Sequence, residues 1–481
     1  MKHVLLMFTD QQRYDTIAAH GNPAIQTPNL DALARDSVVF NHCITPSPVC
    51  IPARLSLFTG QFCARTGCNT NQTSYAKEDF RYKGEGFYDC VTKSGYQSCV
   101  IGKVHHVLDP YGLMGFEKRI SQEEVPHPAD DYTHFIEEKY PYLYDYHGMR
   151  SEMYYVPQIS PLPAEDHPTQ WIGDKSVEYI ENCDPEKPMF LMSSFIHPHP
   201  PFCPPAPWNK LYREDPPAPY APKPEDLADY YDDVLGDRCS CRRLMISEQD
   251  MLRQKNYYYA CVSFVDYQVG RIIKALKDKG MYEDTLIIYT SDHGDMMGDY
   301  SCTGKRTMVD SACHVPFIMH YPGEQPQVRE DVCSLVDVAP TVLSYAGIDY
   351  DPAEYDGVNL FGGEKHTEVY SQYGCGDNGV YMVTDGKDKL VLTKSSGRYF
   401  HFETPADNND IYRHFDLTNP KVQELKAKLD AHVASDVNTY ETSEAGEVYT
   451  KKHPHYPGRG DHKHFHEKEL SRIPEGYTID L

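Results

Sequence analysis

The chain has 481 residues, of which 40% are hydrophobic and 12% aromatic, a composition typical of globular proteins. Its formal net charge of −25 argues against nucleic acid and anionic membrane surfaces as partners, because both repel an acidic protein. A chain of this length exceeds the size at which one hydrophobic core keeps growing, so we expect one large domain and a smaller one.

The cysteine content and the N-terminal residues bear on the compartment. The chain has fifteen cysteines, an odd number, and their spacing shows no pattern of pairs. This fits a reducing compartment better than a disulfide framework. The apolar run over residues 4–8 is too short to span a membrane and lacks a signal-peptide cleavage site. We therefore expect a cytoplasmic protein in which most cysteines are structural thiols.

The first hundred residues alternate predicted strands and helices. The expected elements are strands over 3–9, 38–40 and 97–101 and helices over 28–36, 50–59 and 86–94. Asp10 and Gln11 follow the first of these strands, and Lys103 and His105 follow the third. Open α/β sheets place their sites at the carboxyl ends of buried strands, so these side chains are candidate site residues.

The middle of the chain begins with an irregular, tyrosine-rich stretch over residues 107–168. Such a loop either packs on the surface or forms an amphipathic wall of the substrate pocket. His199 follows a predicted strand, and Asp292 and His293 follow another. The expected elements are helices over 169–182, 247–279 and 336–343, strands over 189–195, 285–290 and 315–320, and an extended proline-rich run to about residue 223.

The order of these elements predicts the fold class. Strands separated by helices, without hairpin signals, indicate an α/β protein with a large, mostly parallel sheet sandwiched by helices. From residue 362 short strands follow one another, with a turn at Asp385-Gly386 and a helix over 420–434. We therefore predict a large α/β domain over 1–361 and a subdomain over 362–481 with a small antiparallel sheet and a helix.

A histidine-rich tail lies near the C-terminus. Its histidines stand among lysines, and their spacing matches no closed metal site. We interpret the tail as a solvated or pocket-capping segment. The histidines concerned are His453, His455, His462, His464 and His466.

Cys50 stands at a predicted helix N-terminus. The Thr-Pro-Ser-Pro run before it cannot continue regular structure, Pro52 suits a first helical turn, and Gly60 supplies a stop. Free N–H groups and the helix dipole favour an anion at such a place. From Cys50 and Arg54 alone, a buried structural cysteine is an equally good interpretation.

The string Cys-x-Pro-Ala-Arg that begins at Cys50, with the trailing Thr59-Gly60, resembles the signature of the type I sulfatases of the alkaline phosphatase-like superfamily. The resemblance implies that Cys50 is oxidised after translation to Cα-formylglycine by a dedicated maturase. It extends over essentially the whole chain. In a cysteine-rich cytoplasmic protein, an anaerobic radical-based maturase is the kind that the context favours.

The resemblance also implies a divalent-cation site. Asp10, Gln11, Asp292 and His293 would hold one cation, with Gln11 and His293 where many family members have an acid and an amide. This variant is similar to choline sulfatases and phosphonate monoester hydrolases. The imidazole suits Mn²⁺ or Zn²⁺, whereas the sulfatase resemblance favours Ca²⁺, which is the ion that we expect.

The remaining polar positions acquire roles through the same resemblance. The hydrate of the converted Cys50 would attack sulfur, with Arg54 and Lys103 steadying it. Lys103, His199 and Lys305 would bind the sulfate oxygens, and His199 or Lys305 would protonate the departing ester oxygen. His105 would be the base that expels sulfate.

These inferences predict a sulfatase that acts on a sulfate monoester of a small sugar or aryl alcohol. The first alternative is a phosphonate monoester or phosphodiester hydrolase of the same superfamily, in which neutral residues replace Lys103 and His105. The second is a non-catalytic protein that binds sulfated glycans, which would have no need of Cys50. Tyrosine-rich composition permits a sugar or an aryl leaving group and decides neither.

Overall fold

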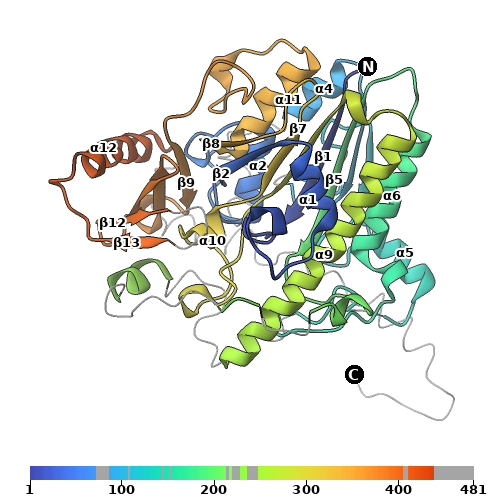
Figure 1. The fold of residues 1–481 in the computed structure, drawn as a ribbon, viewed down its shortest axis with the longest axis horizontal. Coiled ribbons are helices and arrows are strands. Elements are labelled where there is room, and N and C mark those ends of the chain that lie inside the picture. The colour runs from blue at the N-terminus through green and yellow to red at the C-terminus, as the bar shows by residue number, and fades with distance from the viewer. Residues whose placement is uncertain are drawn as a thin grey trace.

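The fold is described by a computed structural model (Figure 1). It describes residues 1–71, 86–106, 109–143, 145–150, 154–212, 216–218, 228–235, 247–404 and 410–437. Within these residues no helix is both long and apolar enough to cross a bilayer. The cysteines of this part of the chain are all free thiols. The histidine-rich tail predicted over 451–467 lies outside the described residues.

The larger sheet has eight strands in the order β4-β3-β5-β1-β6-β7-β2-β8. Only β7 runs antiparallel to its neighbours, so the predicted, mostly parallel sheet is confirmed. The strands are β1 (His3–Asp10), β2 (Val38–Ile44), β3 (Gln97–Gly102), β4 (Lys118–Ser121), β5 (Met189–Pro198), β6 (Thr285–Ser291), β7 (Phe317–His320) and β8 (Gln327–Ser334).

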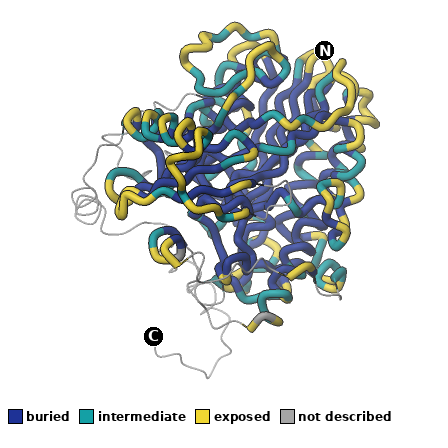
Figure 2. Tube along the Cα trace, turned by 60° about the vertical axis from the view of Figure 1, so that its left-hand side comes forward, coloured by how far each residue is buried: buried dark blue, intermediate teal, exposed yellow. Residues whose placement is uncertain are grey.

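The central strand β1 is buried along its whole length, because apolar side chains leave it on both faces. Figure 2 shows the buried segments filling the interior of the molecule, with the exposed segments around them. Val4, Leu6 and Phe8 join one core cluster, and Leu5 and Met7 join another. Helices α2 (Cys50–Thr59), α4 (Phe87–Lys93) and α11 (Val338–Ala346) pack into the first cluster. Helices α1 (Pro28–Arg35), α6 (Pro168–Asn182) and α9 (Glu248–Asp278) pack into the second.

A five-stranded antiparallel sheet in the order β13-β12-β11-β10-β9 forms the C-terminal part of the described chain. Helix α12 (Pro420–Ser435) packs on one face of it. Buried Lys389 of this sheet forms ion pairs with Asp410, from the same part of the chain, and with Asp310, and the pair with Asp310 ties the sheet to the part of the chain that forms the larger sheet. The strands are β9 (Val369–Tyr373), β10 (Val380–Thr384), β11 (Asp388–Thr393), β12 (Arg398–Glu403) and β13 (Ile411–Arg413).

Several elements did not follow from the sequence pattern. The edge strand β8 carries mostly polar, partly exposed side chains, so it lacks the apolar run that identifies a central strand. Within residues 107–168, predicted to be irregular, Asp130 caps helix α5 (Asp131–Lys139) by accepting from the backbone N–H of Thr133. Among the described strands and α-helices, the others that were not predicted are β4, β13 and the short helices α3 (Cys63–Thr66) and α10 (Asp310–Cys313).

Gly102 ends β3 in a place that excludes a side chain. Its φ is +95°, and a Cβ there would overlap the carbonyl oxygen of Ser194 on β5. The next residue, Lys103, donates its backbone N–H to that same oxygen at 2.9 Å. Gly102 therefore lets β3 approach β5 closely and sets where Lys103 leaves the sheet.

We expect Gly102→Ala to lower the free energy of unfolding by roughly 3 kcal/mol or more. The added methyl group would overlap the Ser194 carbonyl oxygen, and alanine is strained at a positive φ. Gly95→Ala is the matched control, since Gly95 also has a positive φ, +92°, but open space around it. It should cost about 1 kcal/mol. Urea unfolding followed by circular dichroism measures both, and equal losses would contradict the close-packing account.

Candidate active site

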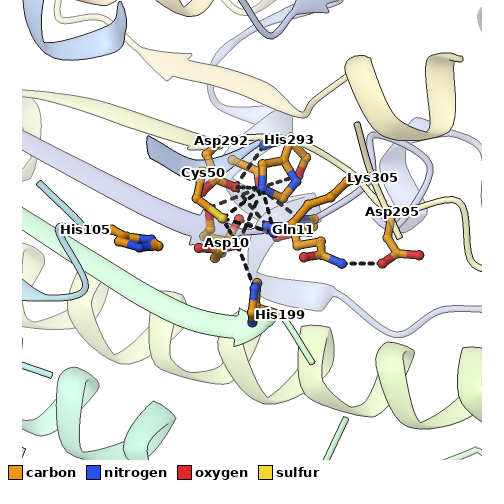
Figure 3. Close-up of polar contacts among 12 residues, drawn as sticks. Asp10, Gln11, Cys50, His105, His199, Asp292, His293, Asp295 and Lys305 are labelled. Carbon is orange, nitrogen blue, oxygen red and sulfur yellow. Dashed lines mark hydrogen bonds and ion pairs between the residues drawn. The ribbon is translucent and has the colours of Figure 1, made fainter. Parts of the chain in front are cut away.

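Four neighbouring strands of the large sheet, β3, β5, β1 and β6, end at one edge, and the candidate side chains follow them (Figure 3). The carboxyl ends of parallel strands meet there, and the first turn of α2 reaches the same place. All of the predicted site residues except His105 are at most 6% exposed. They are Asp10, Gln11, Cys50, Arg54, Lys103, His199, Asp292, His293 and Lys305.

Cys50 is the first residue of α2, as predicted, and its thiol points into the cluster. Its Sγ lies 3.0 Å from Lys305 Nζ, 3.3 Å from His293 Nε2 and 3.7 Å from Asp10 Oδ1. Burial and Asp10 would raise the pKa of the thiol, but the surrounding cations outweigh them and hold the pKa well below its usual value. The side chain at position 50 is therefore surrounded by charges that stabilise an anion.

Arg54, one turn along α2, joins three strand ends. Its Nε donates to Asp292 Oδ2 at 2.9 Å, its Nη2 to Asp10 Oδ2 at 3.1 Å, and its Nη1 to the Lys103 carbonyl at 2.9 Å. The guanidinium also lies over the ring of Phe8, 4.8 Å from its centre. Arg54 is thus held rigidly beneath Cys50, and it orients both carboxylates.

Two buried lysines bring positive charge to the same space. Lys103 Nζ forms ion pairs with Asp10 and Glu124. Lys305 Nζ lies 3.2 Å from His293 Nε2 as well as beside Cys50. Burial would lower the pKa of each lysine, but the anionic groups beside them raise it above the usual value, so both ammonium groups stay charged.

The two predicted catalytic histidines occupy different places. His199 Nδ1 donates to the Pro200 carbonyl at 2.8 Å, which turns Nε2 toward Tyr154 Oη at 3.2 Å and Asp10 Oδ1 at 4.0 Å. His105 lies at the margin of the cluster, apart from Cys50 in Figure 3, and its nearest ionic partner is Glu124 at 3.7 Å. The structure brings the other predicted residues together and leaves His105 on the partly exposed side.

Comparisons with known proteins identify the family. The model of the family described as Sulfatase matches residues 2–348. The chain belongs to the sulfatase family. It is 28% identical over 461 residues to an arylsulfatase of Clostridium perfringens, a match that covers 89% of this chain and 92% of the relative. The sulfatase is accordingly a sulfuric ester hydrolase, as the sequence predicted.

Two further comparisons concern a choline-sulfatase and a phosphonate monoester hydrolase. It is 28% identical over 414 residues to the choline-sulfatase of Rhizobium meliloti, covering 81% of this chain and 78% of that one. The crystal structure of a phosphonate monoester hydrolase of Agrobacterium radiobacter superposes with a TM-score of 0.76 at 23% identity, covering 91% and 96% of the two chains. This second likeness shows the shared fold alone.

The residues predicted to bind a cation fit that role. His293 Nδ1 donates to the Gly294 carbonyl at 2.9 Å, so its Nε2 lone pair faces Asp292 Oδ1 at 3.5 Å and Asp10 Oδ1 at 3.8 Å. Gln11 Oε1 is buried without a hydrogen-bond partner. A divalent cation between these donors would satisfy that orphaned oxygen and both carboxylates.

Two acidic residues of the site were missed by sequence reasoning. Asp295 accepts a hydrogen bond from Gln11 Nε2 and thereby turns Gln11 Oε1 toward the carboxylates. Its place three residues after Asp292 is a signal that could have identified it. Glu124 pairs with Lys103 and Arg150, and it comes from the loop after β4, where no motif marks it.

A second group of possible metal ligands, His167, His197 and Cys203, is explained by local structure. His167 Nδ1 accepts the backbone N–H of Thr169 and so caps α6, and its Nε2 bonds the Cys203 carbonyl. His197 Nδ1 bonds Thr169 Oγ1. These imidazole nitrogens already have protein partners, so we assign the group to structural support.

We expect Asp295→Asn to weaken binding of Ca²⁺ by about 10–100-fold, because the new amide N–H₂ would repel Gln11 Nε2 and turn Gln11 Oε1 away from the cation. Isothermal titration of chelator-treated protein with Ca²⁺, and with Mn²⁺ alongside, measures the affinity.

The double variant Gln11→Glu/Asp295→Asn provides the control for this prediction. The carboxylate introduced at position 11 can accept from the amide introduced at position 295 and still offer an oxygen to the cation, so affinity should return. Unchanged affinity of the single variant would contradict the role of Asp295.

Proposed function

We propose that the sulfatase hydrolyses sulfate monoesters of small sugar or aryl alcohols, with Cys50 converted to Cα-formylglycine and one divalent cation bound beside it. One observation carries this proposal: the buried side chain of residue 50 lies within 3.7 Å of an acid, a histidine and a lysine that come from three different segments. A structural cysteine has no need of such surroundings.

The cation is proposed at Asp10, Gln11, Asp292 and His293. Three oxygen donors against one nitrogen support Ca²⁺, the ion that the family resemblance favours, whereas the imidazole of His293 is the donor that Mn²⁺ and Zn²⁺ prefer. When bound there, such a cation would supply Lewis acidity that lowers the pKa of an adjacent hydroxyl and neutralises charge on a sulfate group. The protein's part is to hold these donors in place, chiefly through Arg54 and Asp295.

The chain's cations provide the proposed sulfate site. Lys305 contacts the side chain at position 50, Lys103 and His199 contact Asp10 beside it, and both lysines carry charge. We assign them to the sulfate oxygens, where fixed charges in a buried site stabilise the transferring group without reorganisation. His199 and Lys305 lie on different sides of Asp10 and Cys50 in Figure 3, and each is a candidate proton donor to the departing oxygen.

His105 is proposed as the base that takes a proton from residue 50 when sulfate is released. Its Nδ1 is buried without a hydrogen-bond partner, and the side chain is 22% exposed. Glu123 Oε1 accepts the backbone N–H groups of Val104 and His105 at 2.7 and 3.1 Å, which fixes the loop that carries the ring. A base at the margin of the cluster can exchange its proton with solvent.

The leaving group is proposed to lie on the side of Tyr154 and Arg150. Tyr154 Oη contacts His199, and the Arg150 guanidinium lies over the Tyr154 ring at 5.2 Å. The tyrosine-rich stretch thus both packs internally, through Tyr132 and Tyr146, and reaches the site. An aromatic wall suits a sugar or an aryl ring, and the arylsulfatase among the relatives supports the latter.

The proposed function predicts that the native protein turns over a small aryl sulfate faster than the matched aryl phosphonate monoester. Cys50→Ala and His105→Ala should each lower kcat for the sulfate by roughly 100-fold or more, because one removes the nucleophile and the other the base. Release of the phenol, followed by absorbance, measures both reactions.

Preference for the phosphonate, with turnover indifferent to His105, would move the protein to the hydrolase alternative. Circular dichroism of both variants serves as the folding control.

A further inference from the structure

Glu124 is an acidic side chain set among the cations of the proposed sulfate site. Its Oε1 forms an ion pair with Lys103 Nζ and lies 3.5 Å from His199 Nε2 and 3.7 Å from His105 Nδ1. Burial would raise the pKa of Glu124, but His199, Lys103, His105 and Arg150 outweigh it and hold the pKa well below the usual value. Glu124 is therefore an anion at neutral pH.

The carboxylate of Glu124 faces the groups that the proposed function assigns to sulfate. Lys103 and His199 are two of the three residues assigned to the sulfate oxygens, and His105 is the proposed base. A sulfate oxygen that approaches Lys103 and His199 meets a like charge at close range. Two anions in a buried space repel strongly, so the carboxylate and the sulfate compete for the same donors.

Arg150 gives the carboxylate a partner on the outer side. Arg150 Nη2 lies 3.0 Å from Glu124 Oε2, and its Nη1 donates to the Glu124 carbonyl at 2.7 Å. The Arg150 side chain is 29% exposed, whereas that of Lys103 is fully buried. Glu124 can thus release Lys103 and His199 while it keeps its ion pair with Arg150.

We propose that Glu124 is a positioning residue whose carboxylate is exchanged for the sulfate group: it holds Lys103 and His199 together, yields them to the ester, and takes them back as inorganic sulfate leaves. This inference rests on the proposed function of the site. The exchange lowers affinity for inorganic sulfate, because each bound sulfate has to displace Glu124. Between turnovers, the Glu124 carboxylate also keeps the neighbouring positively charged side chains in place although they repel one another.

The test is the affinity of the fully processed protein for inorganic sulfate, measured by isothermal titration. We expect Glu124→Gln to bind sulfate at least about tenfold more tightly, since it removes the competing charge while keeping a hydrogen-bond acceptor. In the Glu124→Gln variant, KM for the aryl sulfate should fall and kcat should not rise. Glu117→Gln, the same charge change at an exposed position after the Met114-Gly115 turn, should change sulfate affinity by less than about twofold.

A double-mutant cycle that combines Glu124→Gln with Arg150→Gln distinguishes exchange of the Glu124 carboxylate from a purely structural role of that side chain. Arg150→Gln should weaken sulfate binding in the native background, because displaced Glu124 loses its outer partner. The same substitution should have a smaller effect once Glu124 is glutamine. Equal or weaker sulfate binding by Glu124→Gln, or strict additivity of the two changes, would overturn the proposal. Failure of the native protein to turn over the aryl sulfate would instead overturn the proposed function.

Discussion

The arrangement of the site depends on the buried ion pairs of Arg54. Its guanidinium contacts Asp10 and Asp292, which end two neighbouring strands, and the Lys103 carbonyl beyond a third. A buried ion pair that loses one partner typically costs about 3–5 kcal/mol, because the other charge stays unsolvated. The three strand ends and the first turn of α2 are therefore fixed relative to one another before any substrate binds.

This arrangement explains how an acidic protein can act on an anion. The whole chain carries a formal net charge of −25, yet the space around residue 50 is lined by Arg54, Lys103 and Lys305. Asp10 pairs with Arg54 and Lys103, so it keeps these cations buried and oriented. Low exposure strengthens each interaction with a bound anion, because little water screens the charges. Glu124 adds an anion that lies within reach of both Lys103 and His199.

The sequence predicted the parts of the fold that carry strong local signals. Strand β1 was recognisable because its apolar run ends at Asp10, and α2 because a proline-rich segment precedes it and Gly60 ends it in the left-handed region. Strand β8 was missed because an edge strand needs few apolar side chains. The site residues that stand in motifs were predicted, whereas Glu124 and Arg150 were not, since only the folded loops bring them to Lys103.

We propose that residue 50 of the active protein is Cα-formylglycine, and mass spectrometry of the tryptic peptide over residues 36–54 detects this conversion. This peptide also contains Cys43, a buried structural thiol that serves as an internal standard. After denaturation and alkylation, we expect one alkylated cysteine, Cys43, and an aldehyde at position 50 with the corresponding loss of mass. Alkylation of both Cys43 and Cys50 throughout a fully active preparation would contradict it.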